Sequence, residues 1–247
     1  MSRYVATDWH GVGDIADKIL DFLKPDDELY FLGDAIDRGP NGIYIMYKLL
    51  RDKRVIYLKG NHEDMFAEYV PDFIEGHFAS GSFWLGDNGG KPTWQECERL
   101  TDSDKLLFCR FIKKMPQRLD IINTTGQHII LSHAGCDPWV TDYEAALLGI
   151  KFRYLWDRKH IHTNHEYFRE EEWQNTYVIH GHTPVLAKDF CGDEDVMLPV
   201  CKEIKAAHYA DGHKICLDLY TVGTGRAVLV DLDTFEEIYF DITDKEE

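Results

Sequence analysis

The sequence predicts an α/β protein that begins with a mostly parallel β-sheet. Short apolar runs alternate with segments of helical periodicity up to residue 58, in the order strand, helix, strand, helix, strand. That order is the βαβ pattern of a parallel sheet. The chain has 247 residues, of which 44% are hydrophobic and 13% aromatic, and it contains no linker or internal repeat. We therefore expect residues 1–247 to form a single domain with a large core.

The first five elements follow from these patterns. Residues 3–7, 29–32 and 55–58 have the length and composition of short strands, bounded by polar or turn residues. Residues 15–23 and 43–50 have their apolar side chains spaced on one face of a helix. The pattern predicts three strands joined by two helices.

The order changes after the third strand. Residues 64–115 are largely helical in pattern, with a glycine-rich interruption at 76–90, and we expect them to form a helical cap inserted into the domain. A Thr-Thr-Gly turn at 124–126 separates two apolar runs, at 119–123 and 128–132, and predicts a β-hairpin.

The remaining predicted elements are strands. Residues 176–180 form one of them. Three more segments are expected to form an antiparallel group that closes the fold, at 215–219, 227–231 and 237–240.

The composition is strongly acidic. There are 44 acidic and 27 basic residues, which gives a formal net charge of −17. Such a surface repels nucleic acid and anionic membranes, so we expect neither as a partner. It would also repel a phosphorylated substrate at long range, so any phosphate site needs a local positive charge, for which metal ions are the obvious source.

The N-terminal residues and the cysteines indicate a cellular location. The chain runs directly into the first predicted strand, without a signal peptide or a membrane-spanning apolar run. None of the six cysteines forms a C-x-x-C pair. We expect a cytoplasmic protein with reduced thiols. Nothing in the sequence indicates the oligomeric state.

Five clusters of polar residues each follow a predicted strand. In open α/β sheets, ligands bind beyond the carboxyl ends of the strands, so these clusters should meet in one region. Their oxygen and imidazole groups suit divalent transition metals. Each cluster alone is a weak signal, but the joint occurrence after successive strands predicts a metal site. The clusters are Thr7-Asp8-Trp9-His10-Gly11, Gly33-Asp34-Ala35-Ile36-Asp37-Arg38-Gly39, Gly60-Asn61-His62-Glu63, Ser132-His133-Ala134-Gly135 and His180-Gly181-His182-Thr183.

The clusters resemble the signature of the phosphoprotein phosphatase family within the calcineurin-like metallophosphoesterases. The resemblance extends from about residue 4 to about residue 232 and is strongest to the compact bacterial and phage-type serine/threonine protein phosphatases. Two further segments match that branch, Trp156-Asp157-Arg158 and the set of Trp84, Asn88-Gly89-Gly90 and Thr93. The matching signature residues are Asp8-x-His10-Gly11, Gly33-Asp34-x-x-Asp37-Arg38-Gly39, Gly60-Asn61-His62-Glu63, His133 and Gly181-His182.

The resemblance changes the expected fold. It implies a four-layer α/β/β/α sandwich with a mixed two-sheet core, in which the βαβ start feeds one of two sheets. Residues 64–115 would be the inserted helical cap.

The resemblance also implies a dinuclear metal centre. One metal would be held by Asp8, His10 and Asp34, and the second by Asp34, Asn61, His133 and His182. Asp34 would bridge the two ions, with a hydroxide between them as the nucleophile for in-line attack on phosphate. The donor set suits manganese or iron, and zinc is possible.

Four residues would take part in the reaction itself. By the resemblance, His62 is the general acid for the leaving oxygen, and Asp37 supports its imidazolium form. A third ligand on the second metal is the alternative role for His62. Arg38 and Arg158 would grip phosphate oxygens, to which Asn61 could also donate.

The implied function is phosphomonoester hydrolysis, on a phosphorylated protein or a small phosphoester. Hydrolysis of a dinucleoside polyphosphate is the first alternative, although symmetric diadenosine tetraphosphatases typically replace the aspartate present here as Asp37. Phosphodiester hydrolysis is a further possibility. A non-catalytic metal-binding scaffold is the other class of alternative, but such a protein should have lost a ligand, an arginine or the acid, and all are present here.

Two histidine groups outside the signature need a simpler interpretation. His160, His162 and His165 form an H-x-H-x-x-H pattern without a suitably spaced carboxylate, so we expect an exposed loop rather than a third metal site. His180 lies two residues before His182, and we expect it to support the site rather than to bind metal.

Overall fold

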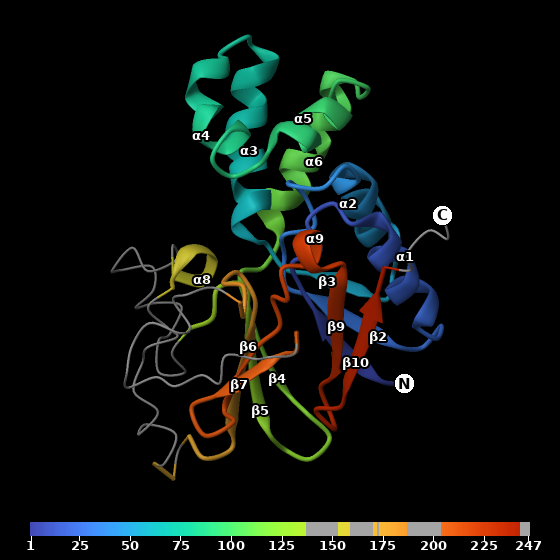
Figure 1. The fold of residues 1–247 in the computed structure, drawn as a ribbon, viewed down its shortest axis with the longest axis vertical. Coiled ribbons are helices and arrows are strands. Elements are labelled where there is room, and N and C mark those ends of the chain that lie inside the picture. The colour runs from blue at the N-terminus through green and yellow to red at the C-terminus, as the bar shows by residue number, and fades with distance from the viewer. Residues whose placement is uncertain (137–152, 159–169, 172, 187–203, 243–247) are drawn as a thin grey trace.

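The computed structural model describes residues 1–136, 153–158, 170–171, 173–186 and 204–242 (Figure 1). Within these residues the strands form two five-stranded sheets, each with parallel and antiparallel neighbours. This confirms the α/β fold with two mixed sheets that the resemblance implied. It corrects the single, mostly parallel sheet expected from periodicity alone, because each of the two sheets combines three parallel strands with antiparallel neighbours.

The first sheet has the strand order β10-β9-β1-β2-β3. Strands β1, β2 and β3 run parallel, with β3 at one edge; on the other side β9 pairs antiparallel with β1, and β10 pairs antiparallel with β9. The crossover helices α1 and α2 lie beside this sheet in Figure 1. The bounds are β1 Arg3–Ala6, α1 Gly13–Phe22, β2 Glu28–Phe31, α2 Gly42–Arg51, β3 Val55–Tyr57, β9 Arg226–Asp231 and β10 Glu237–Asp241.

The second sheet has the strand order β4-β5-β6-β8-β7. Strands β4 and β5 form the predicted antiparallel hairpin, and β6 pairs in parallel with both β5 and β8. The short helices α8 and α9 complete the elements of this half of the chain. The bounds are β4 Arg118–Ile122, β5 His128–Ser132, α8 Arg153–Trp156, β6 Thr176–His180, β7 Ala207–Tyr209, β8 Lys214–Cys216 and α9 Thr221–Thr224.

The predicted closing group of three antiparallel strands was wrong in one member, the segment at 215–219. Strand β8 belongs to the second sheet and runs parallel to β6, whereas β9 and β10 pair with each other in the first sheet. Strand β7 had not been predicted, and it pairs antiparallel with β8. Apolar alternation identifies a strand but does not say which sheet the strand joins, because the chain can cross between sheets at a loop.

Successive side chains of a strand point to opposite faces of its sheet, and this divides the apolar core into separate layers. In β1, Val5 faces the layer between the sheets, whereas Tyr4 and Ala6 face the helices on the outer side. The layer between the sheets also contains Leu131 and Ile179 from the second sheet. The opposite face of the second sheet packs on α8 through Tyr154, among the described residues. The two sheets therefore bury one shared apolar layer, as a sandwich does.

The helical cap consists of five helices that lie together at one end of the molecule in Figure 1. The first of them begins at residue 61, three residues earlier than predicted, so the first turn of α3 carries Asn61 and His62. The segment predicted as an interruption at 76–90 contains the helices η1 and α4. The bounds are α3 Asn61–Ile74, η1 Phe78–Gly81, α4 Ser82–Leu85, α5 Lys91–Cys97 and α6 Asp102–Lys114.

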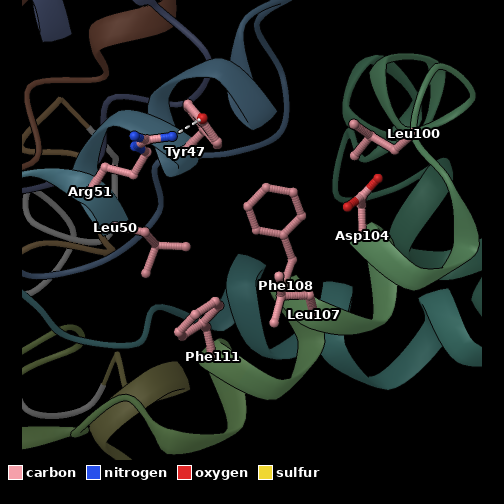
Figure 2. Close-up of a pocket in the computed structure, with 8 residues that line it drawn as sticks. All are labelled: Tyr47, Leu50, Arg51, Leu100, Asp104, Leu107, Phe108 and Phe111. Carbon is pink, nitrogen blue, oxygen red and sulfur yellow. Dashed lines mark hydrogen bonds between the residues drawn. The ribbon is translucent and has the colours of Figure 1, made fainter.

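An apolar pocket of about 430 Å³ lies between α2 and α6 (Figure 2). Leu50 from α2 and Leu107, Phe108 and Phe111 from α6 line it, with Arg51 at its edge. None of its lining residues belongs to the five polar clusters. Among the residues that the structure describes, no helix has both the length and the apolar composition to cross a membrane.

Candidate metal centre

The five polar clusters meet where the strands of the two sheets end. Main-chain hydrogen bonds join the loops directly: Asp8 N–H donates to Gly33 O at 3.0 Å, and His10 N–H donates to Asp34 O at 2.9 Å. In the second sheet, Gly181 N–H donates to His133 O at 2.8 Å. All ten predicted site residues lie in the described part of the chain. Eight are buried, Arg38 is half-buried and Arg158 is exposed.

The backbone of the site is strained. Positive φ is uncommon for residues other than glycine and persists only where the surroundings enforce it. Ten such residues occur in the described part of the chain, and six of them belong to the predicted site. This concentration marks the loops as a site that holds side chains in fixed directions. The six are Asp8 (56°), His10 (42°), Asp34 (59°), Asp37 (71°), Arg38 (67°) and His182 (67°).

Two glycines allow the main chain to pass close to the carboxylates. A Cβ atom at Gly181 would lie 1.9 Å from Asp8 Oδ2, and one at Gly60 would lie 2.1 Å from Asp34 Oδ1. No side chain fits at either position without displacing the carboxylate.

Asp34 lies at the centre of the cluster. Its Oδ2 atom is 3.6 Å from His10 Nε2, 3.6 Å from His62 Nε2 and 3.4 Å from His133 Nε2. Two groups of possible metal-binding atoms share it, one with His10 and His62 and the other with His133 and His182, each within 4.8 Å. A shared carboxylate in two ligand groups is the arrangement that a bridging role requires.

The histidine rings are oriented as metal-binding imidazoles usually are. His10 Nδ1 lies 3.0 Å from Ile36 O, and His133 Nδ1 lies 3.0 Å from Leu32 O. A carbonyl can only accept, so each Nδ1 carries a proton, and the Nε2 atom that faces the cluster is the one that a metal ion would bind.

The second ligand group requires a positive charge. Asn61 Oδ1 lies 2.9 Å from His133 Nε2 and 3.0 Å from His182 Nδ1. Although burial alone would lower the pKa of His133, the Asp34 carboxylate and other acidic neighbours raise it to about 9. A cation bound among these oxygen and nitrogen atoms would remove the repulsion between their lone pairs. The residues therefore fit a divalent ion.

Asp8 lies beside His10, with which it was predicted to hold the first metal. Asp8 Oδ2 accepts the Thr7 hydroxyl at 2.6 Å and the His182 N–H at 3.1 Å, while Oδ1 has no hydrogen-bond partner among the described residues and lies 3.7 Å from His10 Nε2. Burial, and then the charge of Asp218, raise the pKa of Asp8 well above its usual value. An orphaned, buried carboxylate oxygen beside an imidazole nitrogen is what a metal ion would satisfy.

His62 lies against both the candidate metal ligands and Asp37. Its Nδ1 atom is 2.7 Å from Asp37 Oδ2, and both side chains are buried. Its Nε2 atom is 3.2 Å from Arg38 Nη2, whose Nη1 lies 2.8 Å from His10 Nε2. The ligand alternative had placed His62 on the second metal, but the structure places it nearer His10, on the side of the first.

The two arginines lie on either side of the cluster. Arg38 reaches His10 and His62, and Arg158 Nη1 donates to Thr183 Oγ1 at 3.0 Å, next to His182. Burial lowers the pKa of His182, and the charges of His133 and Arg158 lower it further. The two guanidinium groups therefore provide local positive charge in a strongly acidic protein.

Sequence reasoning gave no role to two buried carboxylates, although Glu63 belongs to one of the five polar clusters. Glu63 accepts four hydrogen bonds, from the N–H groups of Asp34, Ala35 and Gly60 and from the Tyr57 hydroxyl, all at 2.8–3.0 Å. Its position three residues after Gly60, at a helix start, is the signal that could have identified it, because a glutamate at that position can accept from the N–H of the residue before the helix.

Asp218 is the second of these carboxylates. It follows β8, Oδ1 accepts the Tyr220 N–H at 2.8 Å, and Oδ2 has no hydrogen-bond partner among the described residues. Burial raises its pKa to about 6, and the Asp34 carboxylate contributes in the same direction. A carboxylate at the end of an apolar strand was the available signal.

The remaining histidines lie outside the cluster or outside the described residues. His180 Nε2 is 2.6 Å from the Tyr209 hydroxyl, and its Nδ1 is 2.9 Å from Gly181 O. Protein groups thus engage both ring nitrogens, which fits the supporting role expected for it. His160, His162 and His165 lie outside the described residues.

Fold and site together define a metallophosphoesterase. The sequence matches the calcineurin-like phosphoesterase family over residues 1–216, which is most of the chain. The chain belongs to that family.

One curated relative is the asymmetrical bis(5'-nucleosyl)-tetraphosphatase PrpE of Oceanobacillus iheyensis, which is 24% identical over 171 residues. The alignment covers 64% of this chain and 63% of the relative, so the chain spans less than two thirds of the relative's length.

Several solved structures share the fold. A serine/threonine protein phosphatase from Saccharomyces cerevisiae has a TM-score of 0.60 at 14% identity and covers 99% of this chain and 81% of its own. A candidate diadenosine tetraphosphatase has a TM-score of 0.58 at 14% identity, covering 97% and 92%. A protein tyrosine phosphatase from a Shewanella species has a TM-score of 0.53 at 14% identity, covering 96% and 77%. The names of these proteins point to different substrates, so the shared fold does not choose among them.

Proposed function

We propose that this chain is a metal-dependent phosphomonoester hydrolase that acts on phosphoserine and phosphothreonine in proteins. The observation that carries the proposal is the buried pair of His62 and Asp37, with His62 Nε2 3.6 Å from the central carboxylate oxygen of Asp34. A serine or threonine alkoxide is a poor leaving group and needs a proton as its bond to phosphorus breaks. A histidine held by a carboxylate is the usual source of that proton.

Each site residue has a proposed role in this reaction. Asp8, His10 and Asp34 would hold one metal ion, and Asp34 with Asn61, His133 and His182 the other. Bound divalent ions would supply Lewis-acid stabilisation of the phosphate and activation of the attacking water. Manganese is the first choice for these oxygen and nitrogen donors, ahead of iron and zinc.

The protein's own groups would bind phosphate and move the proton. Arg38 and Arg158 would each pair with phosphate oxygens, and the Asn61 amide would donate to another. Imidazolium His62 would transfer its Nε2 proton to the leaving oxygen, while its Nδ1–H stays hydrogen-bonded to Asp37. His62 is then neutral, and a proton from solvent restores its imidazolium form.

Hydrolysis of a dinucleoside tetraphosphate is the second candidate, and the PrpE relative supports it. The leaving group of such an anhydride is a nucleotide phosphate, which departs as a stable anion and has little need of an acid. The His62–Asp37 pair therefore favours the monoester. A non-catalytic scaffold is the least supported hypothesis, because the chain has both groups of candidate ligands, the two arginines and His62.

The four cysteines in the described part of the chain are buried and are not in disulfide bonds. We infer a cytoplasmic location, where phosphorylated proteins and nucleotides are both available.

A substrate panel tests the proposal. Chelated protein would be reconstituted with manganese and offered p-nitrophenyl phosphate, its bis ester, a phosphothreonine peptide and diadenosine tetraphosphate. Phosphate release from the first substrate and from the peptide, with little attack on the other two, is the expected result. Preference for diadenosine tetraphosphate would move the chain to the nucleotide branch. Inactivity on all four with metal bound would favour a scaffold.

A further inference from the structure

The helical cap contributes directly to the His62–Asp37 pair. The indole of Trp84, from α4, donates Nε1–H to Asp37 Oδ2 at 2.7 Å, which is the oxygen that also contacts His62 Nδ1. The main-chain N–H of Asp37 donates to Thr93 Oγ1 in α5 at 2.8 Å. Next to it, the Arg38 N–H donates to Gly89 O at 2.8 Å. Cap residues therefore hold both the side chain and the backbone of Asp37.

The Trp84 ring is fixed in place. It is completely buried, packs edge-on against Phe66 at 5.8 Å and is stacked with Phe73 at 5.8 Å and with Tyr69 at 6.5 Å. A Cβ atom at Gly90 would lie 2.4 Å from Trp84 Nε1, so a glycine is needed where the indole passes. The donor therefore has a single position, directed at Asp37.

Asp37 depends on this donor. The residue is fully buried, its φ is 71°, and Oδ1 has no hydrogen-bond partner in the described part of the chain. Oδ2 thus accepts both charge-assisted hydrogen bonds of the side chain. Without the indole, His62 alone would hold the carboxylate, and the pair would lose its connection to the rigid scaffold.

We propose that Trp84 is a positioning residue, which fixes Asp37 and through it directs His62 at the leaving oxygen. The inference rests on the proposed phosphomonoesterase function and adds that the cap is a structural part of the proton-donating site. Nothing in this arrangement requires Trp84 to touch the substrate.

The test is Trp84→Phe, which removes the N–H and keeps most of the ring. A hydrogen bond to a charged group is worth enough to change a rate by roughly tenfold or more. We expect kcat to fall by about that factor for phenyl phosphate, whose leaving group needs a proton. For p-nitrophenyl phosphate, whose leaving group does not, the loss should be below about threefold, with KM and metal content unchanged.

Trp94→Phe is the matched control. Trp94 lies in the same cap and packs on Phe73 and Phe78 at 5.0 Å and 5.9 Å, so it shares the aromatic cluster without reaching Asp37. It should change both rates equally and slightly. If Trp84→Phe behaves like Trp94→Phe, the positioning role is overturned.

A second variant and a spectroscopic measurement keep the test decisive if Trp84→Phe does not fold. Thr93→Val removes the acceptor for the Asp37 N–H and should produce the same difference between the two substrates. In the wild-type protein, the Trp84 indole N–H should give a downfield NMR signal that exchanges slowly and moves when His62→Asn is introduced. A fast-exchanging signal that is insensitive to His62 would contradict the proposal.

The outcomes separate this inference from the proposed function. If His62→Asn lowers the rate for phenyl phosphate selectively and Trp84→Phe does not, only the role of Trp84 fails. If wild-type protein hydrolyses neither monoester, the proposed function fails, and the indole signal still decides whether Trp84 holds Asp37.

Discussion

Side-chain atoms around Asp34 determine what the site can bind. Its Oδ2 atom has three imidazole nitrogens within 3.6 Å, and Asp8 and Asp218 each add a buried oxygen without a hydrogen-bond partner among the described residues. Buried charges are retained only where they are paired or bind metal. Bound cations would therefore explain why these carboxylates and imidazoles are buried together.

His62→Asn should separate substrates by leaving group. Because the proposed role of His62 is protonation, turnover of phenyl phosphate should fall about 10²–10⁴-fold, the usual range for general acid–base catalysis. The loss on p-nitrophenyl phosphate should be much smaller. Steady-state rates on both substrates measure this, with His77→Asn, an exposed cap histidine, as the control. Equal losses on the two substrates would rule out the acid role.

Glu63→Gln should destabilise the protein. Both carboxylate oxygens of Glu63 accept two hydrogen bonds, and a glutamine amide would turn an NH₂ group toward two donors. We expect a loss of about 2–4 kcal/mol in the free energy of unfolding, measured by urea denaturation. Glu68→Gln changes an exposed side chain on the same helix and should have little effect. Similar stability of the two variants would contradict the role given to Glu63.

The ends of strands and the starts of helices position the residues of the site. The loops after β1, β2, β3, β5 and β6 reach one region because the two sheets pack face to face with their parallel strands ending at the same edge. The start of α3 adds Asn61 and His62. The cap, through Trp84 and Thr93, completes the support of Asp37.

Gly181→Ala should disrupt the centre at the junction after β6. The added Cβ would lie 1.9 Å from Asp8 Oδ2, so the carboxylate or the loop must move. We expect manganese affinity to fall by at least about tenfold, the loss typical of disturbing groups around a metal site. Gly126→Ala is the control, because its Cβ would meet open space in the turn between β4 and β5. It should cost some stability but leave metal affinity unchanged. Unchanged affinity in Gly181→Ala would show that the close approach is unimportant.

Local patterns predicted the elements better than their pairing. The βαβ start, the hairpin and the strand at 176–180 follow from periodicity and turn residues close in sequence. The assignment of β8 to the second sheet, and the existence of β7, depend on pairing across long sequence separations. Such pairing is decided by packing, which a single sequence does not display.

Over the whole molecule, positive charge is placed at the site although the protein as a whole is acidic. The chain carries a net charge of −17, yet Arg38 and Arg158 flank the cluster of buried carboxylates and imidazoles.

The ten predicted site residues could be named from their order after strands and from the family resemblance. Trp84 and Thr93 had been noted only as a matching segment, and Asp218 not at all, because their contacts with the site join residues far apart in sequence.

Metal-free protein should lose stability as pH rises. The folded-state pKa of His133 is raised to about 9 from an ordinary 6.5, so its contribution is complete below pH 6.5 and disappears as pH rises through 9. Asp218, with its pKa raised to about 6, acts in the same direction at lower pH. The loss from His133 should be about 3 kcal/mol.

Manganese should suppress this loss, because the ion replaces the proton among the acceptors. Thermal unfolding of chelated and manganese-loaded protein between pH 6 and pH 9 measures the difference. The two Tm values should diverge as pH rises. Parallel curves would show that no cation occupies these ligands.

The most direct test of the central claim is a manganese titration of the chelated protein, following bound metal and phosphate release from p-nitrophenyl phosphate in the same samples. We expect activity to be absent without metal and to rise as two ions bind to each chain. Hydrolysis by the chelated protein, or no hydrolysis with two ions bound, would contradict it.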